Sequence, residues 1–161
     1  MILTKEHLHE IFIYKDGHLY WKIKPSNKTL IGSKAGYANK SGYIEVRYKK
    51  TLYLAHRVIF MMFYGFFPKQ IDHIDGNKNN NLIENLREAS NQQNSLNKPM
   101  PKSNKSGMKN VSWQKSAQKW QVNLCVNKEY KYIGLFNDLE LAQLVAIEAR
   151  NKYHGKFANH L

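Results

Sequence analysis

The sequence predicts an α+β fold with a strand-rich N-terminal region, a central strand-turn-strand-helix segment, and a C-terminal three-stranded antiparallel sheet packed on one helix. Short alternating segments are separated by turn signals such as Asp16-Gly17 and Asp75-Gly76, as is typical of antiparallel hairpins. Helical periodicity is confined to two longer segments, residues 56–64 and 139–153. Together these patterns favour small sheets with few helices.

The N-terminal region, residues 1–55, should open with a short helix and continue as strands. Thr4 is the expected N-cap, since its hydroxyl can accept a hydrogen bond from the first turn. We expect one hairpin around Asp16-Gly17 and another around Lys49-Lys50. The tyrosines and lysines of these strands are candidates for contact with a polyanion backbone.

Residues 56–97 should start with a buried helix over 56–64 that ends at Gly65. Its apolar residues are expected to be core residues and not a cofactor site: Val58, Ile59, Met62 and Phe63. A strand, a tight turn, a short return strand and a helix from about Glu88 to Leu96 are predicted to follow.

Residues 98–106 have the composition of a linker, rich in proline, serine and lysine, and we expect a domain boundary there. Residues 107–161 are predicted to form a compact module. Its expected elements are three strands over 109–113, 120–126 and 130–136, and one amphipathic helix over 139–153.

The composition is that of a globular protein: 161 residues, 42% hydrophobic and 12% aromatic. No apolar run approaches the roughly 20 residues that span a bilayer, and the N-terminus does not resemble a signal peptide. Cys125 is the only cysteine, which excludes a disulfide framework and a cysteine-based zinc site. We therefore expect a cytoplasmic protein.

The net charge of +13 is unevenly distributed. Lysine and arginine outnumber acidic residues by 10 to 4 in residues 1–55 and by 11 to 4 in residues 98–161, whereas residues 56–97 carry 4 of each. This layout indicates two basic arms that bind a polyanion around a chemically distinct centre. The alternative is that the lysines only solvate the surface.

The centre holds an Asp-His pair, Asp72-His73, followed by two amides at Asn85 and Asn94. A carboxylate and an amide can hold a divalent metal beside an imidazole that accepts a proton from water. This combination suits hydrolysis of a phosphodiester bond.

Residues 52–97 resemble the HNH endonucleases of the homing and phage type, whose active site is a ββα-metal motif. The residues that carry this resemblance are His56-Arg57, Gly65, the run from Asp72 to Asn77, Asn81, the run from Glu84 to Arg87, and Asn91 to Asn97.

The resemblance implies a role for each member of the centre. His73 would be the general base, Asp72 and Asn94 would bind the metal, and Asn85 would tether the loop so that the base stays oriented. Asn94 stands where the family often has a histidine, so the ligands are all oxygens. Such a set suits hard cations, and we expect Mg²⁺, with Mn²⁺ as an alternative.

His56 and Arg57 are further candidates. An arginine near the scissile phosphate would stabilise the transition state, but a structural role for both residues is an equal alternative. Asp75 and Asn77 are expected to serve the turn.

The C-terminal module resembles the ethylene-response-factor (APETALA-type) DNA-binding domain. The residues that carry this resemblance are Trp113, Lys119-Trp120, the run from Tyr132 to Phe136, Ala142, Ala146, and the closing run from Gly155 to Asn159. The resemblance implies a three-stranded sheet in the DNA major groove, with a helix packed behind it. Residues predicted to touch DNA across the whole chain are Lys49, Lys50, Lys109, Gln114, Lys115, Lys119, Gln121 and Asn123.

These observations predict a site-specific, metal-dependent endonuclease of double-stranded DNA that nicks one strand per active site in a homing-like role. We expect a monomer with no membrane segment and no obligate protein partner, encoded by a phage and acting in a bacterial host. The alternatives are a non-catalytic DNA-binding or regulatory protein, and a nuclease that is nonspecific or directed at RNA.

Overall fold

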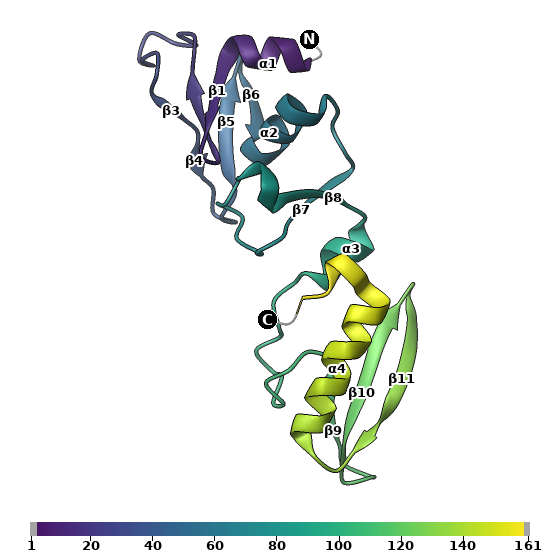
Figure 1. Cartoon of the computed structure of the whole chain (residues 1–161). Helices are drawn as coiled ribbons and strands as arrows, with labels where there is room; N and C mark the ends of the chain where they lie inside the picture. Colours follow the sequence, from purple (N-terminus) through teal and green to yellow (C-terminus); the bar gives the residue numbers. More distant parts are fainter. Residues whose placement is uncertain (1–2, 160–161) are drawn as a thin grey trace. The chain divides into compact units, whose positions relative to one another are not determined.

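The chain divides into two compact units, one up to Ser90 and one from Asn91 onward, in this computed structural model, which describes residues 3–159 (Figure 1). Both units combine small antiparallel sheets with helices, which confirms the predicted α+β class. No helix within the described residues is long and apolar enough to cross a membrane.

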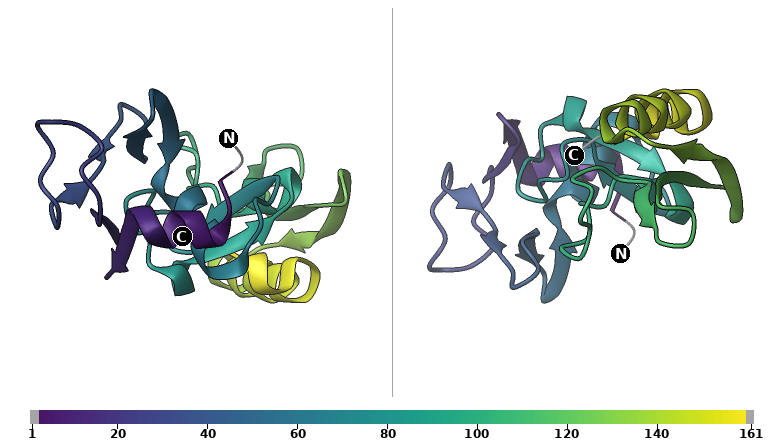
Figure 2. Two further views of the ribbon diagram at one scale, coloured as in Figure 1. Left: turned by 90° about the horizontal axis from the view of Figure 1, so that it is seen from above. Right: turned by 90° about the horizontal axis from the view of Figure 1, so that it is seen from below.

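The first unit contains three small sheets and two α-helices. Its elements are α1 (Lys5–Ile11), β1 (Phe12–Lys15), β2 (His18–Trp21), β3 (Lys34–Ala35), β4 (Tyr37–Ala38), β5 (Ile44–Tyr48), β6 (Thr51–Leu54), α2 (Ala55–Tyr64), β7 (Gln70–His73), the 3-10 turn η1 (Ile83–Asn85) and β8 (Leu86–Ala89). The sheets have the orders β1-β2-β3, β4-β5-β6 and β7-β8. The β2–β3 connection, residues 22–33, loops outward from the unit (Figure 2).

Local sequence signals begin and end these elements as predicted. Thr4 Oγ1 accepts a hydrogen bond from the His7 N–H and caps α1. Asp16 and Gly17 both have positive φ, 49° and 76°, in the turn of the first hairpin. Gly65 adopts the left-handed conformation that ends α2.

One hydrophobic core joins the predicted N-terminal region to the predicted central segment. It draws on α1, both hairpins, α2, β7 and β8, with fully buried members Leu8, Ile11, Leu19, Val46, Val58, Ile59 and Met62. Phe63 was expected in this core but is 41% exposed, and its ring packs edge-on against Tyr14.

The helix predicted from Glu88 to Leu96 is wrong in its first part. Residues 86–89 form β8, which pairs with β7 in an antiparallel ladder. Leu86 and Ala89 are buried, so the long-range ladder and their burial outweigh local helix preference. Only Asn91–Leu96 is helical, as α3.

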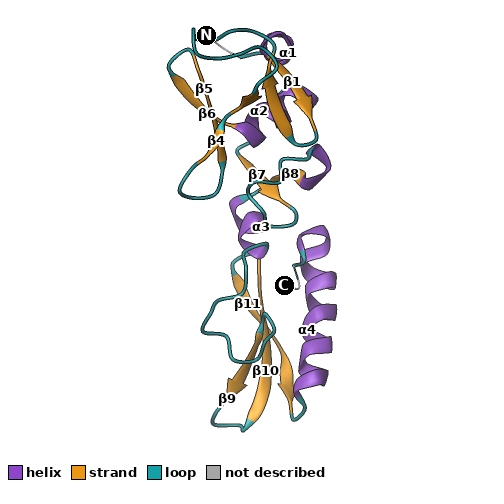
Figure 3. Cartoon of the chain, turned by 90° about the vertical axis from the view of Figure 1, so that its left-hand side faces the viewer, coloured by secondary structure: helices purple, strands orange, loops and turns teal. Residues whose placement is uncertain are grey.

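The second unit is a three-stranded sheet covered on one face by a long helix. After α3 its elements are β9 (Val111–Gln114), β10 (Lys119–Val126), β11 (Glu129–Phe136), α4 (Leu139–His154) and the 3-10 turn η2 (Gly155–Phe157). The strand order is β11-β10-β9, and α4 lies along the sheet (Figure 3). Val122, Leu124, Ala142 and Ala146 are fully buried between the two layers. The predicted strands and helix are confirmed, except that β9 starts two residues later.

The break between the units falls at Ser90 and not within the predicted linker, residues 98–106. That segment is held to the second unit by side-chain hydrogen bonds. Asn104 Nδ2 donates to the Met108 carbonyl, and Ser106 Oγ donates to the Val111 carbonyl at 2.8 Å. Its polar side chains therefore hydrogen-bond to backbone carbonyls at and just before the start of β9, and the segment is not a free tether.

We predict that Gly17→Ala destabilises the first unit more than Gly32→Ala does. Both glycines have φ near +80°, but an added Cβ at Gly17 would lie 2.9 Å from the Leu82 nitrogen and 3.2 Å from the Asn81 carbonyl carbon, whereas nothing lies within 4 Å at Gly32. Gly32→Ala should cost about 1 kcal/mol for its backbone alone, and Gly17→Ala roughly 1–3 kcal/mol more. Urea unfolding of both variants measures the difference, and equal losses would contradict the close packing at Gly17.

Candidate active site

The β7–β8 ladder positions the Asp-His pair. Asp72 lies opposite Arg87 and His73 lies opposite Leu86, and both members of the pair are buried, at 3% and 5% exposure. Asp72 Oδ2 accepts hydrogen bonds from Arg87 Nε at 2.8 Å and Nη2 at 2.6 Å. Both contacts reach the same carboxylate oxygen, so the charge-assisted pair holds Oδ2 against Arg87.

The His73 imidazole is held by Asn81. Its Nε2 lies 3.0 Å from Asn81 Oδ1, and Asn81 is 2% exposed. An amide oxygen can only accept a hydrogen bond, so Nε2 carries the proton in this arrangement. The lone pair of the neutral ring is then on Nδ1, which is the state that a general base requires.

The loop between β7 and β8 is closed by Asn85. Its Oδ1 accepts from the Asp75 N–H, and its Nδ2 donates to Asp75 Oδ1 and to the Asn80 carbonyl at 2.8 Å. Burial opposes ionisation of Asp75, but hydrogen bonds from Asn80, Asn85 and the Asn77 backbone hold the pKa of its carboxyl below the ordinary value. Asn85 thus tethers the loop, and Asn81 contacts the imidazole.

A second imidazole lies beside the first. The His56 ring meets the His73 ring edge-on with centroids 5.0 Å apart, and the Tyr43 ring lies 5.3 Å from His56. His56 Nδ1 is buried with no hydrogen-bond partner within residues 3–159. Burial, the proximity of His73 and the charge of Arg57 lower the pKa of His56 to about 3. His56 is therefore neutral at physiological pH.

Arg57 is directed elsewhere. Its Nη2 donates to the Pro68 carbonyl at 2.9 Å, and its guanidinium stacks on Phe67 at 5.7 Å. These contacts tie α2 to the segment before β7. They favour the structural role over a contact with the scissile phosphate.

Asn94 lies on α3 in the second unit, whereas Asp72 lies in the first. Within the described part of the chain, no three His, Cys, Asp or Glu side chains gather closely enough to hold a metal ion. The predicted ligands, the Asp72 carboxylate and the Asn94 amide oxygen, are not a group of three such side chains. The metal therefore stays a prediction.

The outer face of the β9-β10-β11 sheet, opposite α4, brings together four of the eight residues predicted to touch DNA. Gln114 pairs with Lys119, and Gln121 and Asn123 follow at alternate positions, while Val122 and Leu124 point to the core. Tyr132 lies opposite Asn123 and Tyr130 opposite Cys125, so two aromatic rings, 58% and 89% exposed, join this face. Polar and aromatic side chains on one exposed face suit contact with nucleic acid.

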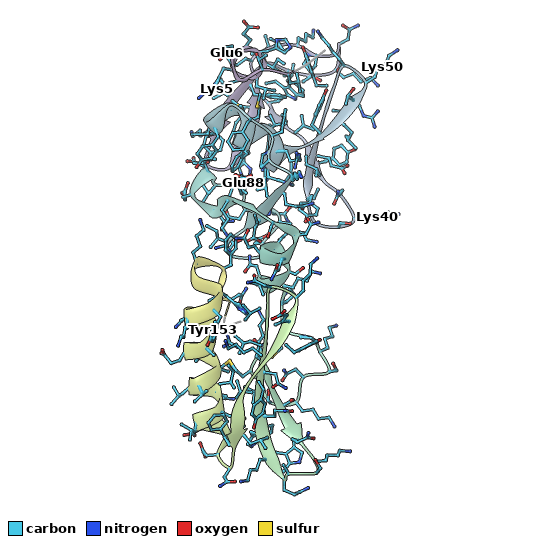
Figure 4. The ribbon with its side chains drawn as sticks, turned by 90° about the vertical axis from the view of Figure 1, so that its right-hand side faces the viewer. Lys5, Glu6, Lys40, Lys50, Glu88 and Tyr153 are labelled. Atoms are coloured by element: carbon cyan, nitrogen blue, oxygen red, sulfur yellow. The ribbon has the colours of Figure 1, made fainter. Side chains whose placement is uncertain are left out.

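The other lysines of the predicted set divide into two kinds. Lys49 and Lys50 form the β5–β6 turn with positive φ, and the side chain of Lys50 points into solvent (Figure 4). Lys115 lies exposed in the β9–β10 turn. Lys109 differs, because it precedes β9 and its Nζ is buried.

Sequence reasoning missed Asn81, Arg87 and Tyr43 as neighbours of the Asp-His pair. Asn81 carries part of the family resemblance, but no role was expected for it. It is the one buried member of the run Asn79 to Asn81. Arg87 was detectable once β7 and β8 were paired, since it lies opposite Asp72.

The comparisons with known proteins concern the region that contains this site. Residues 53–96 match the HNH endonuclease family, and the chain belongs to that family. It is 42% identical over 98 residues to Protein 3.8 of Escherichia phage T7, and the aligned region covers 58% of this chain and 78% of that protein. It is 46% identical over 79 residues to the uncharacterized HNH endonuclease L560 of Acanthamoeba polyphaga mimivirus, covering 47% of this chain and 41% of that protein. No solved structure matches the chain significantly.

We predict that His56 makes the protein less stable in mild acid. Its folded pKa of about 3 lies below the ordinary value of 6.5, so the unfolded chain binds the proton more readily. Stability from this group is complete above pH 6.5 and is lost as pH falls toward 3. The loss between pH 7 and pH 5 should be about 2 kcal/mol.

Denaturant unfolding of the wild type and of His56→Gln across that range measures the effect. The substitution should remove this part of the pH dependence, while His18→Gln, a change on the β1–β2 hairpin, should leave it in place. Parallel curves for His56→Gln and wild type would contradict the prediction.

Proposed function

We propose that the chain is a metal-dependent endonuclease that hydrolyses phosphodiester bonds in double-stranded DNA at the Asp72-His73 pair. The observation that carries the proposal is the hydrogen bond from His73 Nε2 to the buried Asn81 Oδ1. It places the lone pair of the neutral ring on Nδ1, and the preceding residue, Asp72, is a carboxylate held through its Oδ2 by Arg87. Family membership supports the same reaction class.

His73 acts as the general base. Its Nδ1 accepts the proton of the attacking water as the water oxygen bonds to phosphorus and the bond from phosphorus to the leaving 3′ oxygen breaks. The leaving oxygen then takes a proton from solvent. The Nε2–H···Oδ1 bond to Asn81 shares the charge that develops on the ring. His56 stays neutral because of its low pKa, so it adds no positive charge beside the imidazolium that forms. Asn81 and Asn85 position the base and its loop without touching the reacting atoms.

The donor set fits a hard divalent cation. A carboxylate has two oxygens and several lone pairs, so Asp72 can ligate a metal while its Oδ2 accepts from Arg87. Asp72 and the amide oxygen of Asn94 are the proposed ligands, and waters complete an oxygen set suited to Mg²⁺ or Mn²⁺. When bound, the metal would stabilise negative charge on the phosphate and on the leaving oxygen.

The rest of the chain would select and hold the duplex. The outer face of the β9-β10-β11 sheet and the Lys49-Lys50 turn are the proposed contacts, in line with the resemblance to the ethylene-response-factor domain. One Asp-His pair per chain supports nicking of one strand by a monomer. We further propose a homing-like role in a viral setting, because both relatives named above are viral.

A non-catalytic DNA-binding or regulatory protein is the alternative. It would use the same basic surfaces but would not need a buried carboxylate beside an imidazole held in one tautomer. The Asp72, His73 and Asn81 arrangement therefore favours the enzyme.

We predict that His73→Ala abolishes nicking of supercoiled plasmid in Mg²⁺, lowering the rate by at least about 100-fold through loss of the general base. The matched control is His18→Ala, which removes an imidazole from the β1–β2 hairpin and should nick at the wild-type rate. Circular dichroism checks that both variants are folded. Equal nicking by wild type and His73→Ala would support the non-catalytic alternative.

We predict that Asn81→Asp shifts the pH dependence of the nicking rate. A carboxylate beside Nε2 still accepts its hydrogen bond but favours the protonated ring, so the acidic limb should move to higher pH by on the order of one unit. Asn79→Asp places the same charge on an exposed neighbour and should shift it little. An acidic limb that stays in place in both variants would show that Asn81 does not influence the general base.

A further inference from the structure

The second unit contains a cationic cavity that the proposed active site does not use. It has a volume of about 530 Å³ and is bounded by the segment after α3, the start of β9, the second half of β10 and the last turns of α4. Four of its lining residues can carry positive charge: Lys98, Lys109, Arg150 and His154. No acidic residue lines it among those that the structure describes.

The Lys109 ammonium group is poorly compensated. Its Nζ is buried and has no hydrogen-bond partner within residues 3–159, although an ammonium carries three donors. A buried cation without an acceptor is costly unless a counter-charge approaches it. Burial lowers the pKa of Lys109, and the positive charge of Arg150 lowers it further.

Arg150 adds a second buried charge, at 2% exposure. Its Nη1 donates to the Lys109 carbonyl at 2.6 Å, and its Nη2 contacts Met108 Sδ at 3.1 Å. These acceptors are neutral. The guanidinium is thereby fixed against the backbone of Lys109 on the wall of the cavity.

The strand lengths account for the open space. β9 pairs with β10 only as far as the Val111–Val122 pair, so the half of β10 beyond Val122 is not paired with β9. There the Asn123 N–H donates to the Asn110 carbonyl, and the Cys125 carbonyl lies 3.2 Å from His154 Nε2. Asn123 and Cys125, from this free half, line the cavity. Asn123 also belongs to the outer face of the sheet, so that face and the cavity are continuous.

We propose that this cavity binds a phosphate group. A phosphate presents several acceptor oxygens and a negative charge, which the Lys109 ammonium lacks and which Lys98 and Arg150 attract. The source that fits the neighbouring surface is a backbone phosphate of duplex DNA lying along the outer face. That source rests on the proposed function, whereas binding of phosphate itself does not.

The test uses the full chain with three charge-removing variants. Lys109→Gln and Lys98→Gln alter the cavity, and Lys98 is exposed, so its loss does not threaten folding. Lys128→Gln removes one charge from the exposed β10–β11 turn of the same unit and is the matched control. Thermal unfolding is followed in sodium phosphate and in sodium chloride of equal ionic strength.

Phosphate should raise the melting temperature of wild type and Lys128→Gln above that in chloride, and this gain should be smaller in Lys98→Gln and absent in Lys109→Gln. Equal melting in the two salts for the wild type would overturn the proposal. So would a gain that all three variants retain.

A second measurement identifies the source of the phosphate. Binding of a fluorescent duplex is titrated without divalent metal at several salt concentrations. If the backbone fills the cavity, Lys109→Gln should weaken binding about 3- to 10-fold and reduce the salt slope by about one relative to wild type. If phosphate stabilises the protein but this slope is unchanged, the cavity takes a free phosphate compound instead of DNA. Nicking by the wild type is measured separately, so failure of the proposed nuclease function can be distinguished from failure of phosphate binding in the cavity.

Discussion

The side chain of Asn85 closes the loop between β7 and β8, and the candidate active site depends on that closure. Its amide oxygen and nitrogen are both used, on the backbone and carboxylate of Asp75 and on the Asn80 carbonyl. Leaving such buried groups unpaired costs roughly 1–3 kcal/mol each. The closed loop also carries Asn81, whose Oδ1 lies 3.0 Å from His73 Nε2 and favours the tautomer with the proton on that nitrogen. Asn85 thus acts on the imidazole through the loop, without contacting it.

The two units differ in how their buried charged groups are compensated. In the first, the buried Asp72 carboxylate is paired with Arg87, and His56 is kept neutral by burial. The charges near His73 are therefore few and oriented. In the second, the Lys109 ammonium group and Arg150 are both buried, and both residues line a cavity that has no acidic residue among the described lining. The first arrangement suits proton transfer, and the second suits capture of an anion.

Much of the fold could be predicted because local signals there agree with tertiary packing. Thr4, Asp16-Gly17 and Gly65 each require a particular backbone geometry, and each has it. The segment at residues 86–89 was mispredicted as helix because strand pairing with β7 is a long-range interaction that the segment does not encode. The misplaced linker has the same cause, since Asn104 and Ser106 find partners only in the folded unit.

For the site, the sequence by itself determined which groups are available: an adjacent carboxylate and imidazole, amides downstream, and basic flanks. Their residue types and spacing suffice for that, because they limit the chemistry to a few possibilities. Only the tertiary structure decided how the groups are used. In the folded chain Arg87 pairs with Asp72, and Asn81, out of a run of three asparagines, contacts His73. The Arg57 guanidinium bonds to the Pro68 carbonyl, and the Lys109 ammonium group is buried. Those outcomes depend on ladder register and loop closure, which arise from contacts between residues distant in the chain.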